Sequence, residues 1–143
     1  MRCWIYTAKW GNKLATRTQA RESVIGLLYA YDLGNEKITL FVDEILEDKK
    51  IRNKQKDFAL KLFNGVIDNL NTIDTEITSH LDKRGLDDIG SVEKSILRLA
   101  SYEILFENLD KPIIINEAIE LSKRLAGDNA PKFVNGILDK VHK

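Results

Sequence analysis

Apolar residues recur every three or four positions along most of the chain, a spacing that places them on one face of an α-helix. No alternation of apolar and polar residues persists long enough to indicate a strand. The predicted helices cover residues 16–33, 38–46, 54–71, 72–81, 91–108 and 114–126, and a last helix has Pro131 in its first turn. We therefore expect an all-α fold, a compact bundle of about seven helices in two small helical subdomains.

Residues that favour helix ends delimit the last segments. Ser91 is a good N-cap for the helix at 91–108. Pro112 is expected to interrupt the chain before the helix at 114–126, and Gly127 is placed to end that helix in the left-handed conformation.

The helix at 91–108 is apolar around most of its circumference, so we expect it to be central and buried. Its basic strip consists of Lys94 and Arg98, one turn apart. Glu103 falls inside the apolar arc, and a buried carboxylate needs a partner. We expect an internal hydrogen bond or ion pair for it.

The first helix carries two apolar stripes on opposite faces. The expected core stripe consists of Ala20, Val24, Leu27, Leu28 and Tyr31, and the second consists of Ile25, Tyr29 and Leu33. Two hypotheses remain open for the second stripe. It packs against the other helical half, or it binds a partner.

Composition and charge narrow the class of protein. Basic and acidic residues number 22 each, so the net charge gives no reason to expect nucleic-acid binding. Residues 1–21, however, contain basic residues and no acidic residue. No apolar run approaches the roughly 18–20 residues that span a bilayer. The single cysteine, Cys3, excludes an internal disulfide or a Cys-rich zinc site. We expect a cytoplasmic protein without membrane contact.

Residues 1–14 hold both tryptophans and the cysteine but have no helical period. We expect them to lie outside the domain at 15–143, as a disordered extension, a fusion remnant or the product of a misplaced start.

No pattern indicates catalysis. The histidines, His80 and His142, lack a partner at ligand spacing, and there is no phosphate-binding loop or nucleophile motif. His80 shares a face with Ile77 and is interpreted as a satisfied core histidine. We expect no catalytic residue, metal site or cofactor.

The segment at 127–133 is the best candidate for an anion site. A helix N-terminus offers unpaired N–H groups and a positive dipole end, and Lys132 adds a cation. Phe133 offers a ring on which a base can stack, a contact worth about 1–3 kcal/mol. These parts suit single-stranded RNA better than duplex DNA, and an ordinary helix junction is the alternative.

Four motifs occur in one order along the chain. They are RTQARE with LLY at 17–29, VEKSILRLASYE at 92–103, INEAIELSK at 115–123 and KFVNGILDK at 132–140. Together they resemble the NusB family of bacterial transcription antitermination factors over residues 16–142. The resemblance implies an all-α fold of two subdomains. It also implies binding to boxA RNA of ribosomal operon leaders with NusE, a small-subunit ribosomal protein, and assembly with RNA polymerase and other Nus factors.

By position, the resemblance assigns functional residues. Those expected to bind RNA are Arg17, Arg21, Glu93, Lys94, Asn129, Lys132 and Phe133. Tyr29 and Glu93 fall where the NusE and RNA surfaces of the family meet, so the candidate partner-binding residues are Ile25, Tyr29, Leu33 and Glu93.

One departure keeps alternatives open. Thr18 and Gln19 separate two arginines that are consecutive in members with a strong arginine-rich start. An interaction module with weak RNA binding is therefore one alternative. Another is an RNA-binding domain related to that of rRNA cytosine methyltransferases, which would need a cofactor domain that does not occur before Lys143. The sequence leaves open whether the free protein is a monomer or a homodimer.

Overall fold

The computed structural model describes residues 14–143, and predictions about residues 1–13 lie outside this range. Within it the chain forms seven α-helices, two short 3-10 helices and no strand, which confirms the predicted all-α class. The elements are α2 (Arg17–Asp32), η1 (Glu36–Leu40), α3 (Val42–Asp48), α4 (Lys54–Asp68), α5 (Leu70–Ser79), η2 (Leu86–Asp88), α6 (Ser91–Phe106), α7 (Lys111–Leu125) and α8 (Ala130–Leu138).

Helix α6 is the central element, as its sequence predicts. Residues 94–104 of this helix are all buried. It packs against α2, α4, α5, α7 and α8. The buried basic side chains of α6 therefore meet carboxylates from neighbouring helices, as Arg98 meets Asp32 of α2 and Asp74 of α5.

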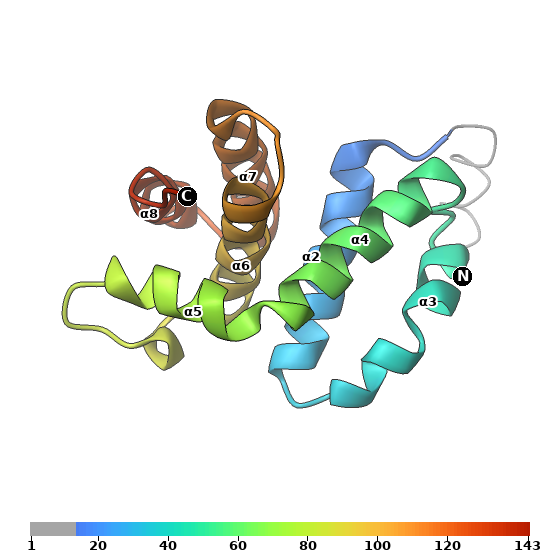
Figure 1. Ribbon diagram of the computed structural model, residues 1–143, viewed down its shortest axis with the longest axis horizontal. Helices are drawn as coiled ribbons and strands as arrows, with labels where there is room; N and C mark the ends of the chain where they lie inside the picture. Colours follow the sequence, from blue (N-terminus) through green and yellow to red (C-terminus); the bar gives the residue numbers. More distant parts are fainter. Residues whose placement is uncertain (1–13) are drawn as a thin grey trace.

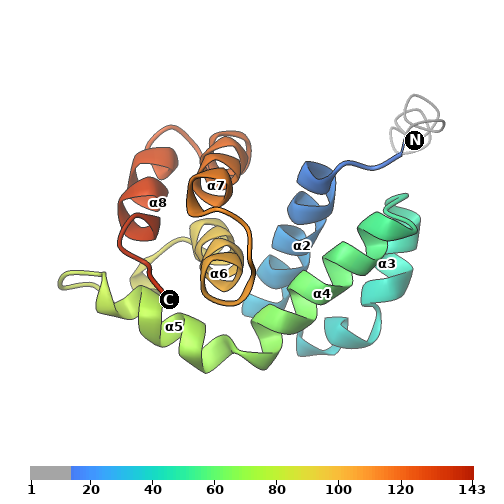
Figure 2. The same ribbon diagram turned by 45° about the horizontal axis from the view of Figure 1, so that its top comes forward.

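The helices fall into two halves. Figure 1 shows α2, α3 and α4 on one side and α5, α6, α7 and α8 on the other, and Figure 2 shows the same division from a second direction. The buried apolar residues of both halves nevertheless belong to one continuous cluster. We call the contact of α2 with α6 and α7 the seam, because it joins the two halves.

A glycine allows α4 to approach α6 closely. A Cβ atom added at Gly65 would lie 2.2 Å from Cζ of Tyr102, far inside van der Waals contact. The Tyr102 hydroxyl donates a hydrogen bond to Glu107 at 3.0 Å. Burial and this hydrogen bond raise the pKa of Tyr102 to about 12. Gly65 thus leaves room for the ring of Tyr102, which packs against α4 while its hydroxyl is hydrogen-bonded to Glu107.

Several predicted boundaries are wrong, for local reasons. The segment at 38–46 is not one helix, because η1 ends at Leu40 and α3 begins at Val42. Helix α7 begins at Lys111 with Pro112 in its first turn, where the missing N–H has no helical partner to lose. Ser91 is the first helical residue and Gly90 is the cap.

Other expectations about helix ends are confirmed. Gly127 follows α7 with a φ of 110°, in the left-handed region that favours glycine. Pro131 lies in the first turn of α8. In residues 14–143 no helix is both long enough and apolar enough to span a membrane.

Candidate nucleic-acid interface

Arg21, expected to bind RNA, is buried in the seam. Its Nε and Nη2 atoms donate to the two carboxylate oxygens of Glu103 at 2.9 and 2.8 Å, and Nη1 lies 3.4 Å from Glu117. Its relative exposure is 4%. Burial alone would lower the pKa of Arg21, but the hydrogen bonds and charge of Glu103 outweigh it and the pKa is raised. This pair confirms the internal partner expected for Glu103. The expected contact of Arg21 with RNA stays a prediction, and in this structure its guanidinium is bound by carboxylates of the chain itself.

Arg17 is the basic residue that the start of α2 presents to solvent. Its guanidinium carbon lies 4.3 Å from the centroid of the Phe58 ring, in cation–π geometry. Within residues 14–143 it has no carboxylate partner. Thr18, which interrupts the family's arginine run, donates a hydrogen bond to Glu117 at 2.8 Å. Among the arginines of α2, Arg17 is therefore the exposed one, and the interrupting threonine contributes a hydrogen bond to the seam.

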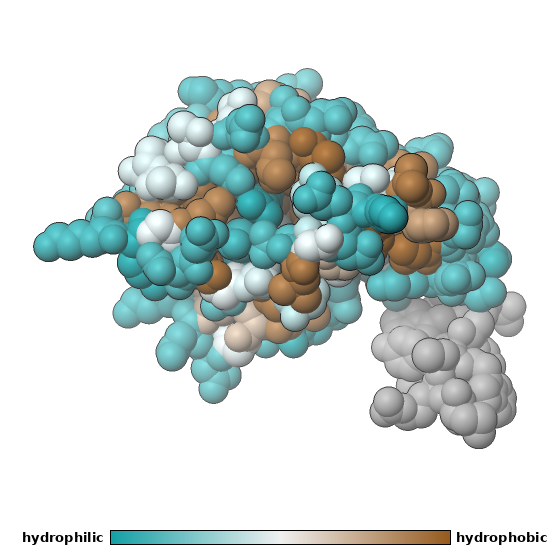
Figure 3. Space-filling view, turned by 90° about the horizontal axis from the view of Figure 1, so that it is seen from below, coloured by the Kyte–Doolittle hydropathy of each residue, from teal (hydrophilic) through white to brown (hydrophobic). Residues whose placement is uncertain are grey.

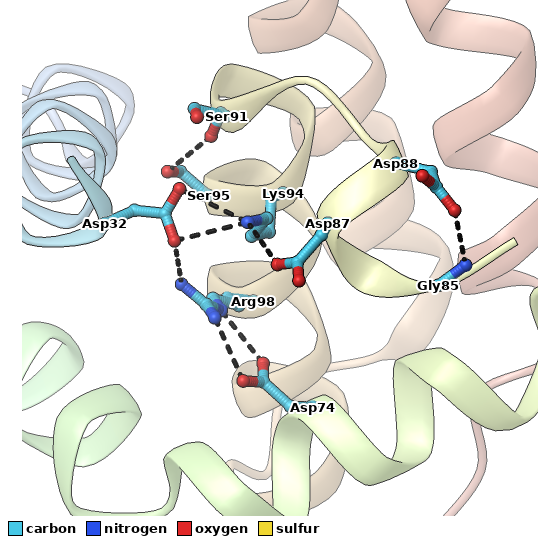
Figure 4. A network of polar contacts seen from close by, with 9 residues as sticks. All are labelled: Asp32, Asp74, Gly85, Asp87, Asp88, Ser91, Lys94, Ser95 and Arg98. Atoms are coloured by element: carbon cyan, nitrogen blue, oxygen red, sulfur yellow. Dashed lines mark hydrogen bonds and ion pairs between the residues drawn. The ribbon is translucent and has the colours of Figure 1, made fainter.

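Lys94 is also buried, with a relative exposure of 7%. Its Nζ atom lies 3.3 Å from both carboxylate oxygens of Asp32, at the end of α2, and 4.0 Å from Asp87. Figure 4 shows that Asp32 contacts both Lys94 and Arg98 and that Asp74 of α5 contacts Arg98 from below. The charge of Lys94 is therefore compensated by Asp32, and its expected contact with RNA stays a prediction.

Lys94 and Asp32 belong to a second ion-pair network, which Arg98 and Asp74 complete. Arg98 donates to Asp74 at 2.8 and 2.9 Å and to Asp32 at 3.1 Å. Burial alone would raise the pKa of Asp32, but the charge and hydrogen bond of Lys94 hold that pKa below its ordinary value of 3.8. The network joins α2, α5 and α6 through charges that are all compensated.

Glu93 lies in the first turn of α6, half-buried. Its carboxylate folds back toward the helix start, because a Cβ atom at Gly90 would lie only 2.4 Å from Glu93 Oε1. The positive end of the helix dipole favours a negative charge at this place. Glu93 therefore lies half-buried at the helix start, with its carboxylate beside Gly90.

The segment at 127–133, which we call the α8 junction, contains the start of α8. Asn129 is exposed at the start of α8 and its side chain makes no capping hydrogen bond. Lys132 is exposed, and among residues 14–143 no carboxylate pairs with it. Phe133 is half-buried and packs against the core. An unpaired cation and a half-buried aromatic ring thus occupy consecutive positions in the first turn of α8.

Arg84 adds a residue to the junction that sequence reasoning missed. Its guanidinium carbon lies 4.9 Å from the centroid of the Phe133 ring. It comes from the loop between α5 and η2, which has no periodicity that would relate it to α8. A long-range contact of this kind leaves no signal in the local sequence pattern.

The second apolar stripe of α2 is divided. Ile25 is 3% exposed and packs in the seam, which agrees with the packing alternative for this residue. Its expected role in partner binding stays a prediction. Tyr29 and Leu33 are exposed at 38% and 62%. Figure 3 shows one face of the molecule, on which hydrophobic patches are separated by hydrophilic side chains.

His80 is satisfied, as expected, but it is not in the core. Its Nε2 atom lies 2.8 Å from Glu76 Oε2, and its side chain is 21% exposed. Among residues 14–143 no group of three or more His, Cys, Asp or Glu side chains is placed to hold a metal ion.

Comparison with known proteins gives one consistent result. The profile of the NusB family matches residues 18–143. The transcription antitermination protein NusB of Aliarcobacter butzleri (strain RM4018) is 77% identical over 130 residues, which cover 91% of this chain and 99% of that protein. The protein of the same name from Campylobacter jejuni (strain RM1221) is 55% identical, with 91% and 98% covered.

Solved structures agree. NusB from T. maritima superposes with a TM-score of 0.82 at 35% identity, covering 90% of this chain and 91% of that one. A structure of antitermination factors NusB and NusE in complex with dsRNA gives a TM-score of 0.80 at 32% identity, covering 88% and 95%. Sequence, family profile and fold together show that this chain belongs to the NusB family.

Proposed function

We propose that this chain is a transcription antitermination factor that binds boxA RNA of ribosomal operon leaders together with NusE. In this role it joins RNA polymerase and other Nus factors in the cytoplasm, and the role requires no catalysis. Two findings support the proposal: relatives that are up to 77% identical are named as antitermination proteins, and a related chain was crystallised with NusE and double-stranded RNA.

The observation that carries the RNA-binding part is the α8 junction. Lys132 is exposed and without a carboxylate partner in residues 14–143, so its charge is available for a phosphate. Asn129 offers an amide at the N-terminus of α8, and the ring of Phe133 is partly open. Cation, amide and ring are the groups that hold the phosphate and base of an unpaired nucleotide.

The buried cations have another role in this proposal. Arg21 and Lys94 bind carboxylates of this same chain and hold α2 against α6. They position the surface that binds RNA and do not themselves contact phosphate. Arg17, which is exposed, supplies the contact from the start of α2.

We assign NusE to the surface that includes Tyr29, Leu33 and Glu93. Tyr29 and Leu33 are the exposed part of the second apolar stripe of α2. The Asp32–Lys94 contact places the end of α2 beside the start of α6, where Glu93 lies. Ile25 lies beneath this surface and supports it by packing.

The test is a titration of fluorescent boxA-like RNA with this protein, with and without NusE, at several salt concentrations. Phosphate contacts predict that affinity falls as salt rises, and NusE should increase it. Both single-stranded and double-stranded forms of the RNA belong in the titration, because the related crystal structure holds dsRNA. Binding to NusE without RNA binding in any condition would replace the proposal with the interaction-module alternative.

Lys61→Ala is the matched control for Lys132→Ala. Lys61 is 64% exposed and lies beside Glu107, which follows the last turn of α6. It is therefore at the opposite end of α6 from Glu93 and the proposed NusE surface. Both substitutions remove one positive charge, so a general charge effect would weaken RNA binding equally in the two variants. A contact at the α8 junction would weaken binding only in Lys132→Ala.

A further inference from the structure

Arg84 is an exposed cation that faces an aromatic ring. Its guanidinium carbon lies 4.9 Å from the Phe133 ring centroid, within cation–π range. The loop that carries it emerges beside α5 at the same end of the molecule as α8 in both Figure 1 and Figure 2.

The acids near Arg84 in the sequence do not neutralise it. Asp88 accepts a hydrogen bond from the backbone N–H of Gly85 at 2.9 Å, and Asp87 lies 4.0 Å from Lys94. No carboxylate of residues 14–143 lies within ion-pair distance of Arg84. Its charge is therefore available to a ligand, and its guanidinium carbon lies over the ring that the α8 junction would offer to a base.

We propose that Arg84 and Phe133 form a two-sided slot for one unpaired RNA base, which inserts between the guanidinium and the ring. This inference rests on the RNA-binding function proposed above and deepens it. Guanidinium planes and aromatic rings both stack on bases. Lys132, next to Phe133 in the chain, would then bind the phosphate of the inserted nucleotide.

The slot requires only a small movement. Two stacked layers at about 3.5 Å each need about 7 Å between ring and guanidinium, so Arg84 must withdraw by about 2 Å from its present 4.9 Å. Arg84 is on an exposed loop, whereas Phe133 is held by the core, so the arginine is the side that moves. In the free protein the guanidinium covers a ring that would otherwise face water.

Two other roles for Arg84 make different predictions. If Arg84 only shielded Phe133, its removal would uncover the ring and RNA would bind more tightly. If Arg84 only contacted a phosphate, Arg84→Lys would bind as well as the wild type, because lysine keeps the charge and loses the plane.

The test compares Arg84→Ala, Arg84→Lys and the adjacent control Lys83→Ala, which removes the same charge from the same exposed loop. RNA affinity is measured by anisotropy, and thermal unfolding checks that each variant is folded. We expect Arg84→Ala to weaken binding of boxA-like RNA about tenfold or more, Arg84→Lys to recover only part of this loss, and Lys83→Ala to have less than a threefold effect.

A second readout reports the stacking itself. 2-Aminopurine placed at each RNA position in turn should be quenched on binding at one position, and Arg84→Ala should remove that quenching. Wild-type affinity in Arg84→Ala, tighter binding in that variant, or full rescue by Arg84→Lys would overturn the slot while leaving the proposed function intact. A wild-type protein that binds no RNA, with or without NusE, would overturn both.

Discussion

The seam and the α8 junction contain the same types of side chain and use them in opposite ways. In the seam Arg21, Lys94 and Arg98 are at most 7% exposed, and each is bound by carboxylates of another helix. At the junction Lys132 and Arg84 are exposed and have no such partner in residues 14–143. The neutral net charge of the chain conceals this division.

The difference follows from the energetics of burial. A charge removed from water must be compensated by a partner, and removal of one partner leaves the other uncompensated. An exposed cation contributes little to folding but remains available to a phosphate. Substitutions in the seam should therefore affect stability, and substitutions at the junction should affect binding.

The largest expected effect is that of Arg21→Ala. It leaves Glu103 buried at 2% exposure without its main cation, and we expect a loss of about 3–5 kcal/mol in the free energy of unfolding. Urea denaturation measures this loss. The double variant Arg21→Met, Glu103→Leu removes both charges and should regain most of the stability. A single variant of normal stability and reduced RNA affinity would instead place Arg21 on the RNA.

Phe133→Ala should affect both properties, because the ring belongs to the core margin and to the junction. The half-buried side chain predicts a loss of about 2 kcal/mol in the free energy of unfolding, together with weaker RNA binding. Denaturation and anisotropy on the same preparation separate the two effects. Phe133→Leu, which keeps most of the apolar volume, should retain stability and lose RNA affinity. Equal RNA binding by the leucine variant would contradict a stacking role for the ring.

Part of the pH dependence of stability should come from the ion pairs of Asp32 in the seam. The pKa of Asp32 is held below its ordinary value of 3.8, so its ion pairs stabilise the folded protein fully above that value. This contribution is lost as pH falls through the lowered pKa, because protonation discharges the carboxylate. Asp32→Asn should be less stable than the wild type at neutral pH and should lose less stability on acidification. Parallel pH profiles for the two proteins would contradict this assignment.

The sequence predicts the features that depend on the local spacing of apolar residues. It does not predict those that depend on contacts between residues far apart in the chain. The apolar circumference of α6 predicts its central place, and the position of Glu103 in that arc predicts a buried partner. The identity of the partner does not follow, since Arg21 and Glu103 are 82 residues apart. Two arginines at helical spacing look alike in sequence, and only the packing of α2 on α6 distinguishes the buried one from the exposed one.

The same limit explains the other differences. Ile25 and Tyr29 share a stripe, yet one lies in the seam and the other on the surface. Arg84 reaches Phe133 from a loop that has no period. At the α8 junction, by contrast, the cation, ring and helix start are neighbours in the chain, so the sequence could predict their proximity.

The most direct measurement of the central claim is the salt dependence of RNA affinity for Lys132→Ala beside the wild type, with urea denaturation of both. We predict unchanged stability within about 0.5 kcal/mol, weaker RNA binding, and a slope of log affinity against log salt that is smaller by about 0.7, the value for one phosphate contact on a single strand. Unchanged affinity and slope would contradict the assignment of RNA binding to the α8 junction.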